Sequence, residues 1–309
     1  MKKTKKYEFI VSSEDEGKRL DVYLCDMLGE EASRSLVQKW IKNGYVCGSV
    51  PVKSSLQVET GNEFTIEIPQ TVPHSVEPVD LQLQILHEDK DLAVIVKPPG
   101  IAVHPGPGEK QVTLINGLHY LWKNLPGDEQ RPGIVHRLDA PTEGIMLIAK
   151  NEKAHRILAE DFQNRNIKKQ YSAWLGAAPS LPEGRIELAI KRHPHERMKM
   201  RIDATGRMAV TLYKIEKCIV SKKGRKFAFA DIEILTGRTH QIRVHMAHIG
   251  CPVVGDSLYS RTHAQFSRFG LLLFARKLEF LHPVSKIEMK FELTLPDRFL
   301  EFEKKCQAF

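Results

Sequence analysis

Two short segments near the start of the chain place hydrophobic residues at helical spacing. The first follows Gly17, and its hydrophobic stripe consists of Leu20, Tyr23, Leu24, Met27 and Leu28. The second, SRSLVQKWIKNG, is expected to begin at Ser33 as its N-cap and to end at Asn43-Gly44. Its apolar face consists of Leu36, Val37, Trp40 and Ile41. Two strand-like runs, GYVCG and FTIEIP, follow, so the pattern predicts a small α/β module over residues 1–70.

After a proline-bearing linker, expected over residues 71–84, the hydrophobic pattern changes to short strand-like runs. Six runs are rich in β-branched or aromatic residues and are bounded by Gly, Pro or Asp: LAVIVKP, GIMLIAK, YSAWLG, AVTLYKI, FAFADIEIL and MKFELTL. One clear helix, NEKAHRILAEDFQNRN, spaces Ile157, Leu158 and Phe162 so that they face a sheet. Residues 85–309 are therefore predicted to form an α+β domain with a mixed, largely antiparallel sheet.

The composition fits a globular protein of about two domains. The chain has 309 residues, 42% of them hydrophobic and 27% charged, which excludes a disordered, collagen-like or coiled-coil protein. The basic N-terminus has no apolar run after its lysines, so a signal peptide is not predicted, and no stretch approaches the roughly 20 apolar residues of a membrane span. The five scattered cysteines form no CxxC pair, so neither a disulfide framework nor a zinc ribbon is expected, and a cytoplasmic location is predicted.

The positive charge is concentrated in one segment of the larger domain. The net charge of +8 favours an anionic partner. Residues 1–70 hold 10 basic and 11 acidic residues, whereas residues 185–226 hold 13 and 4. Such a segment is typical of a surface that follows phosphates, with a solvated basic loop as the alternative. The candidate contacts are Lys191, Arg192, Arg197 and Lys199, and the interleaved Met198, Met200 and Met208 are expected to pack in the core.

One stretch, RPGIVHRLDAPTEGIMLIAK, carries a candidate reactive carboxylate. A strand is expected to end in His136-Arg137-Leu138-Asp139, to break at Pro141 and to resume after Gly144. An acid at such a junction, beside an arginine, can act as a nucleophile or a base, although a structural role is the common alternative. The letters HRLD overlap with the kinase catalytic loop, but the other kinase motifs are absent from the sequence, which excludes a kinase.

A second stretch, LTGRTHQIRVHMAHIGCPVVGD, gathers polar residues around Arg238. Its three histidines, His240, His245 and His248, raise the possibility of a metal site. No Asp, Glu or Cys ligand stands at a familiar spacing from them, and no HExxH occurs. Packing with one or two functional hydrogen bonds is therefore favoured over metal binding.

The N-terminal segment resembles the alpha-L RNA-binding module. The resemblance lies in RLDVYL, SRS, QKWIKNGYV and a closing turn before an IEI strand, although Cys47-Gly48 stands where an Asn-Gly turn is usual. Such a module implies that the helix face of Arg34, Gln38 and Lys42, at i, i+4 and i+8, meets an RNA backbone. A solvated helix face is the alternative.

The ordered motifs of nearly the whole chain resemble the RluA family of pseudouridine synthases. The segments are DLAVIVKPPGIAVHPGPG, GIVHRLDAPTEGIMLIAK, IKKQYSAWLG, KRHPHERMKM, TGRTHQIRVHMAHIGCPVVGD and LEFLHPVSKIEMKFELTLP. The resemblance implies the synthase fold, with a central RNA cleft, and the isomerisation of specific uridines. The implied substrate is large-subunit ribosomal RNA, with transfer RNA as the alternative. No cofactor and no metal are implied, and a monomer is expected.

The resemblance also assigns roles to single residues. Asp139 corresponds to the catalytic aspartate, which attacks the nucleotide or assists glycal formation. Tyr171 of the Lys-x-Tyr motif would stack on the uracil and relay a proton, and Arg137 would fill the place of the flipped base. Arg238 of GRTHQ is expected to keep Asp139 ionised through an ion pair. The remaining candidate RNA contacts near the cleft are His136, Lys169, Thr239, His240 and Gln241.

Three departures from the family pattern bear on the RNA target more than on the reaction. Glu143 adds a negative charge near Asp139, Val96 replaces an asparagine, and Phe274 replaces a histidine. Two other hypotheses stay open: a non-catalytic RNA-binding factor on the same scaffold, and an unrelated metal-assisted or phosphoryl-transfer enzyme. The joint presence of an aspartate, a tyrosine and an arginine at the motif positions favours the isomerase.

Overall fold

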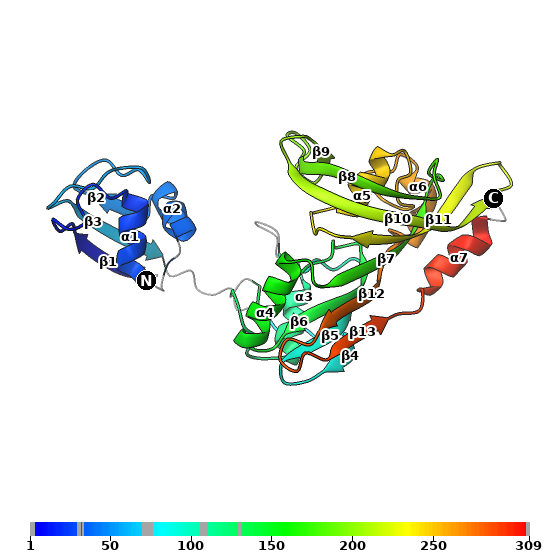
Figure 1. Ribbon diagram of the computed structural model, residues 1–309, viewed down its shortest axis with the longest axis horizontal. Helices are drawn as coiled ribbons and strands as arrows, with labels where there is room; N and C mark the ends of the chain where they lie inside the picture. The colour runs from blue at the N-terminus through cyan, green and yellow to red at the C-terminus, as the bar shows by residue number, and fades with distance from the viewer. Residues whose placement is uncertain are drawn as a thin grey trace. The chain divides into compact units, whose positions relative to one another are not determined.

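The computed structural model describes residues 4–29, 32, 34–69, 77–105, 111–128 and 131–306. The chain divides into two compact units, Met1–Ser75 and Val76–Phe309 (Figure 1). Ser33, the expected N-cap, and residues 70–76 of the linker region lie outside the described residues. Residues 77–83, which the sequence assigned to the linker, belong to the second unit, because the Asn116 side chain donates to the carbonyl of Glu77 (3.0 Å) and the Val79 N–H donates to the carbonyl of Asn116 (3.1 Å).

The first unit is a three-stranded antiparallel sheet with two helices. The sheet has the order β1-β3-β2, and its elements are β1 (Thr4–Ile10), α1 (Leu20–Leu28), α2 (Arg34–Lys42), β2 (Val46–Gly48) and β3 (Glu63–Pro69). Both helices were predicted, and Gly44, with a φ of 75°, ends the second one. Leu20 and Leu24 of α1 pack with Val37 of α2 against the sheet residue Phe64, so this unit has a core of its own.

The second unit is built on a ten-stranded mixed sheet. Its order is β4-β5-β6-β12-β7-β11-β10-β8-β9, and β13 also pairs with β12. Every strand pair is antiparallel except β6 with β12, so the predicted α+β class with a largely antiparallel sheet is confirmed. The strands are β4 (Gln84–Glu88), β5 (Leu92–Lys97), β6 (Glu143–Ala149), β7 (Lys168–Leu175), β8 (Glu183–Arg192), β9 (Met200–Ile202), β10 (Arg207–Val220), β11 (Lys226–Ile234), β12 (Leu273–Leu281) and β13 (Glu288–Glu292).

Helices cover the sheet on both faces through separate hydrophobic clusters. They are α3 (Leu114–Leu121), α4 (Glu152–Gln163), α5 (Gln241–His248), α6 (His263–Phe266), a 3₁₀ turn over Ser267–Phe269, and α7 (Asp297–Cys306). Leu158 of the predicted helix α4 is buried against β5 and β6, whereas Phe302 of α7 packs on Trp174 of β7 with ring centroids 5.3 Å apart. Each helix among the described residues is too short or too polar to cross a membrane.

A narrow junction joins the two halves of the large sheet. The parallel pairing of β6 with β12 comprises only Glu143 with Phe274 and Gly144 with Ala275. Gly144 has a φ of 132°, and a Cβ atom there would lie 2.3 Å from the carbonyl oxygen of Ala275, so no other residue fits this position. The Glu143 carboxylate accepts from the guanidinium of Arg298 on α7 (2.9 Å). This ion pair offsets the negative charge that Glu143 was expected to add near Asp139.

Two expectations about the local structure of the second unit are wrong. No strand ends at Asp139. Pro132 and Gly133, whose φ is 69°, interrupt the extended backbone, so that Ile134 forms only an isolated bridge to Ile148. The chain then forms the turn that leads into β6. Met198 and Met208 are not core residues, because they are 70% and 51% exposed on the hairpin of β8, β9 and β10.

Candidate active site

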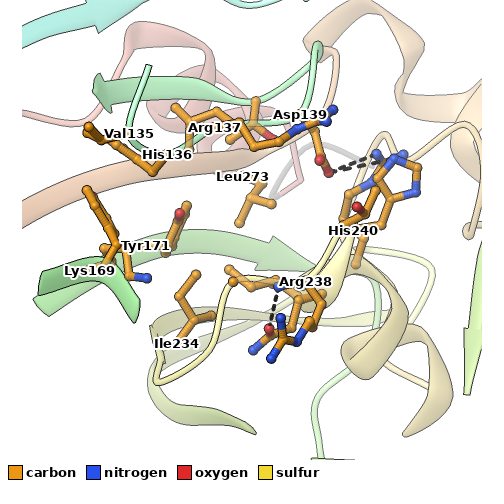
Figure 2. Close-up of a pocket in the computed structure, with 18 of the residues that line it drawn as sticks. Val135, His136, Arg137, Asp139, Lys169, Tyr171, Ile234, Arg238, His240 and Leu273 are labelled. Carbon is orange, nitrogen blue, oxygen red and sulfur yellow. Dashed lines mark hydrogen bonds and ion pairs between the residues drawn. The ribbon is translucent and has the colours of Figure 1, made fainter. Parts of the chain in front are cut away.

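A cavity of about 390 Å³ lies where the turn before β6 faces β7 and the loop before α5 (Figure 2). Asp139 projects into it from the turn, and Tyr171 lines it from β7. Ile234 and Leu273, at the ends of β11 and β12, add apolar side chains to the lining. The cavity therefore combines one carboxylate and one phenol with apolar side chains and several cationic ones, such as Arg137 and Lys169, and its volume is in the range of small-molecule sites.

The Asp139 carboxylate is held by a buried arginine. The Nη1 atom of Arg243 donates to Asp139 Oδ2 at 3.2 Å. Arg243 is in turn fixed by Asp256, whose two carboxylate oxygens accept from Nε (2.7 Å) and Nη2 (2.8 Å). The side chains of Arg243 and Asp256 are 2% and 0% exposed, and the paired carboxylates raise the pKa of the guanidinium against the effect of burial. A permanent cation thus stands beside Asp139.

One oxygen of Asp139 is engaged and the other is open. Both Arg243 Nη1, at 3.2 Å, and His240 Nε2, at 3.9 Å, approach Oδ2. The described residues offer no hydrogen bond to Oδ1, and the side chain is 15% exposed toward the cavity. The geometry leaves Oδ1 as the carboxylate oxygen that is available to a molecule in the cavity.

The ion pair predicted between Arg238 and Asp139 is not formed. Arg238 lies in the loop before α5, where its N–H donates to Gln241 Oε1 (3.0 Å) and its Nε donates to the carbonyl of Met208 (3.2 Å). Figure 2 shows its side chain apart from Asp139. Arg243 takes the place expected of Arg238 because it lies on the buried side of α5, next to Asp256. Two signals for this pair in the sequence were missed: Arg243 is the second arginine of the same motif, and Asp256 is the aspartate of VVGD.

Tyr171 is an almost fully buried phenol. Burial first, and then the charge of Asp139, raise the pKa of its hydroxyl well above the ordinary value. The side chain is 7% exposed and forms part of the central hydrophobic cluster of the second unit. At neutral pH it is a neutral phenol that offers a ring surface and one O–H group to a molecule in the cavity.

His136 is held as a neutral ring under the turn. Its Nε2 accepts the backbone N–H of Leu147 (2.8 Å), and the ring stacks on Phe162 with centroids 4.5 Å apart. Because the Nε2 lone pair is occupied, the proton of the neutral ring lies on Nδ1. Burial, with a further contribution from the charge of Lys169, lowers the pKa of His136 to about 3. His136 therefore positions the turn against β6.

Acid should weaken the fold through His136. Its pKa is about 3 in the folded protein against 6.5 for an exposed histidine, so the unfolded chain binds more protons between these values. The stability that neutral His136 supports is complete above pH 6.5 and is lost as the pH falls toward 3. Between about pH 7 and about pH 5 we expect the free energy of unfolding to fall by up to about 2 kcal/mol more in the wild type than in His136→Gln. Urea unfolding at both pH values measures this, and equal losses in the two proteins would contradict it.

Lys97 is a buried lysine whose ammonium group binds the turn that carries Asp139. Its ammonium group donates to the carbonyls of Pro98 (2.7 Å), Ile101 (2.8 Å) and Ala140 (3.0 Å). Burial lowers the pKa of Lys97 to about 8, so the group is still charged at neutral pH and its three protons match three acceptors. Ala140 follows Asp139 directly, so this contact helps to fix the backbone at the carboxylate.

The similarity to known proteins agrees with this arrangement. Residues 91–248 match the RNA pseudouridylate synthase family. The chain belongs to this family. An RNA pseudouridine synthase of Aquifex aeolicus (strain VF5), named as uncharacterized, is 38% identical over 97% of this chain and 96% of the relative. Ribosomal large subunit pseudouridine synthase D of Escherichia coli O6:H1 (strain CFT073) is 36% identical over 96% of this chain and 93% of the relative.

A solved structure supports the same fold. Human RNA pseudouridylate synthase domain containing 4 has a TM-score of 0.56 at 27% identity, covering 73% of this chain and 93% of that protein. The predicted family is therefore confirmed, and the protein is an RNA pseudouridine synthase, an isomerase that acts on RNA.

The other residues predicted to bind RNA near the cavity of the synthase fall into two groups. Arg137, Lys169 and Thr239 line the cavity, with Arg137 the most exposed of the three. Lys169 lies with its ammonium group 5.4 Å from the ring centroid of Phe162, and burial lowers its pKa to about 8. Gln241 also borders the cavity, but its amide is buried and occupied by Thr236, Val210 and the Arg238 N–H, among others, so it shapes the loop.

The predicted contacts farther from the cavity are mostly exposed. On the hairpin, Lys191, Arg192 and Arg197 are exposed and Lys199 is half-buried in an ion pair with Glu196 (2.6 Å). In the first unit, Lys42 is exposed.

The other two residues of the helix face in the first unit are tied to a buried carboxylate. Arg34 and Gln38 donate to Asp21 at 3.1 and 2.5 Å. Asp21 also accepts from Arg19, the strongest of the effects that lower its pKa. This carboxylate therefore holds two arginines at the edge of the first unit.

The described residues place one group of possible metal ligands near the β4–β5 turn, away from the cavity: Asp89, Asp91 and His282. The Nδ1 atom of His282 accepts the N–H groups of Val284 (3.2 Å) and Ser285 (3.0 Å). Its proton therefore lies on Nε2, which donates to Asp89 (3.0 Å), so this nitrogen has no lone pair for a metal ion. The cluster is a structural tie between β12 and the β4–β5 turn.

Proposed function

We propose that this synthase isomerises specific uridines in large-subunit ribosomal RNA, with transfer RNA as the alternative substrate. The pairing of Asp139 with buried Arg243 carries the proposal for activity, because an inert scaffold has no need of a carboxylate with one oxygen open to a cavity. The name of the Escherichia coli relative supports the choice of RNA. We further propose that the protein acts as a monomer in the cytoplasm, where its described cysteines stay free thiols.

The proposed mechanism assigns one task to each group in the cavity. Isomerisation breaks the bond from N1 of uracil to the ribose, rotates the base, joins C5 to the same carbon, and moves a proton from C5 to N1. Asp139 starts the reaction through Oδ1, either by attack on the nucleotide or by taking a ribose proton toward a glycal. Arg243 holds the other oxygen of that carboxylate. The Tyr171 ring receives the uracil face, and its hydroxyl relays the proton leaving C5.

Access to the cavity requires the uridine to leave its stack. Arg137 is exposed at the cavity, and its planar guanidinium suits the gap that a flipped base leaves. The β8–β10 hairpin then follows the backbone with Lys191, Arg192, Arg197 and Lys199, while Lys42 and the arginines around Asp21 give the first unit a second contact surface.

A salt titration tests the role of the hairpin. We expect the alanine variant of all four hairpin cations to lower the slope of log K against log salt by about 0.7–0.9 for each RNA phosphate that the hairpin no longer neutralises. A matched variant removes four exposed lysines elsewhere, Lys90, Lys123, Lys153 and Lys304, and should leave the slope near that of the wild type. Equal slopes for the two variants would contradict a specific role of the hairpin.

The proposed substrate is tested by mapping pseudouridine in cellular RNA with and without the gene for this protein. We expect one or a few uridines of large-subunit ribosomal RNA to lose the modification, and the purified protein to restore it in unmodified transcripts. Restoration in transfer RNA alone would replace the substrate and keep the reaction. No change at any uridine, in cells or with purified protein, would overturn the proposal.

A further inference from the structure

Tyr259 contacts both Arg243 and His240, the two described side chains that approach Asp139 Oδ2. It lies outside the region of the family match. The guanidinium carbon of Arg243 is 5.3 Å from the centroid of the Tyr259 ring. The Tyr259 hydroxyl is 2.8 Å from His240 Nδ1, and the two rings meet edge to face with centroids 5.7 Å apart. The same hydroxyl accepts the backbone N–H of Met200, the first residue of β9, at 2.7 Å.

These contacts favour one tautomer of His240. The phenol oxygen accepts from Met200, and the Nδ1 lone pair of His240 is the acceptor within reach of the phenol's own proton. The proton of the neutral imidazole then lies on Nε2, which faces Asp139 Oδ2 at 3.9 Å.

Burial, the largest effect, lowers the pKa of His240 and keeps the ring neutral. The charges that face it are Asp139, Arg243, Asp256 and Arg137. Of these, the two carboxylates favour a protonated ring and the two guanidinium groups oppose it, so burial decides the outcome.

We propose that Tyr259 is a positioning residue for the two side chains beside Asp139 Oδ2, Arg243 through its ring and His240 through its hydroxyl, and that it links them to the RNA-contacting hairpin through Met200. The role of the hairpin in this inference rests on the proposed function. Because Arg243 donates to Oδ2 and His240 lies beside it, Oδ1 is the oxygen that meets the nucleotide. Because Met200 begins the strand that follows Arg197 and Lys199, a shift of the hairpin on RNA reaches the Tyr259 hydroxyl directly.

Removal of the hydroxyl separates this role from packing. Tyr259 also packs with Met200, Ile202 and Val244, and Tyr259→Phe retains that packing and the ring beneath Arg243. We expect kcat to fall about tenfold, the worth of one hydrogen bond near a charge, with KM for RNA within about twofold of the wild type. The matched variant is Tyr213→Phe, which alters a half-buried tyrosine on β10 outside the cavity and should keep wild-type kinetics. Wild-type kcat in Tyr259→Phe, or an equal loss in Tyr213→Phe, would overturn the inference.

A second measurement needs no turnover, and its wild-type part does not depend on whether the variant folds. Nitrogen-15 NMR of the histidine-labelled wild type, without RNA, should show His240 protonated on Nε2, and Tyr259→Phe should show a mixture of tautomers. A wild-type His240 protonated on Nδ1 would overturn the inference. Inactivity of the wild type on every RNA would instead count against the proposed function, because the tautomer is read without a substrate.

Discussion

Replacement of Asp139 by asparagine should abolish isomerisation while the fold and RNA binding persist. The amide has nearly the same shape, so the turn held by Lys97 and Thr142 stays in place, but the group can neither attack nor take a proton. We expect activity to fall by about 10³-fold or more, measured as pseudouridine by mass spectrometry after incubation with the RNA substrate. The thermal midpoint should change little, because Arg243 keeps its bidentate partner Asp256.

The same substitution at Asp297, exposed at the start of α7, provides the control and should keep full activity. Substantial turnover by Asp139→Asn would remove this carboxylate from the mechanism. A loss of RNA affinity equal to the loss of activity would show that the carboxylate serves binding and not chemistry.

Arg243→Met should be the most destabilising single change at the site. It leaves Asp256, which is 0% exposed, without its cation, and loss of one partner of a buried pair typically costs about 3–5 kcal/mol. Asp139 also loses the donor that holds Oδ2, so kcat should fall. Urea unfolding measures the first effect, and the rate of pseudouridine formation measures the second.

Two comparisons make this result specific. Arg238→Met, which removes a partly exposed guanidinium bound to a backbone carbonyl, should lower kcat less than Arg243→Met does. The double variant Arg243→Met with Asp256→Asn should recover part of the stability without recovering activity, because the buried charge is gone but Asp139 still lacks its partner. A larger loss of kcat in Arg238→Met than in Arg243→Met would restore the assignment made from the sequence.

The sequence predicted the elements whose signals are local. Helices α1, α2 and α4 show periodic apolar stripes, and Asn151 caps α4 by accepting from the N–H of Ala154 (2.9 Å). Strand β8 was not predicted, because one of its faces is partly exposed and carries charged residues such as Arg185. Such a strand lacks a long apolar run, and only its neighbours in the sheet define it. Strand β12 was not predicted either, although it begins with the apolar run Leu273-Phe274-Ala275.

The candidate site was predicted where a motif marks it and missed where the contact depends on the tertiary fold. Asp139 and Tyr171 were identified and both line the cavity. Arg238 and Arg243 lie five positions apart in one motif, and only the packing of α5 decides which one reaches an aspartate 104 residues earlier in the chain. The acceptors of Lys97 are backbone carbonyls, and because every residue has one, the sequence could not predict these contacts.

The two-pair junction of β6 with β12 has a consequence for the biosynthesis of the enzyme. The junction joins Glu143 to Phe274, and the cavity needs Leu273 from the same strand, so a growing chain has no complete cavity until β12 has emerged from the ribosome. By then β8, β9 and β10 of the hairpin have already been made. Closing so long a loop for so few backbone hydrogen bonds makes this junction a late step of folding. A nascent chain therefore completes its basic hairpin before it can complete the cavity.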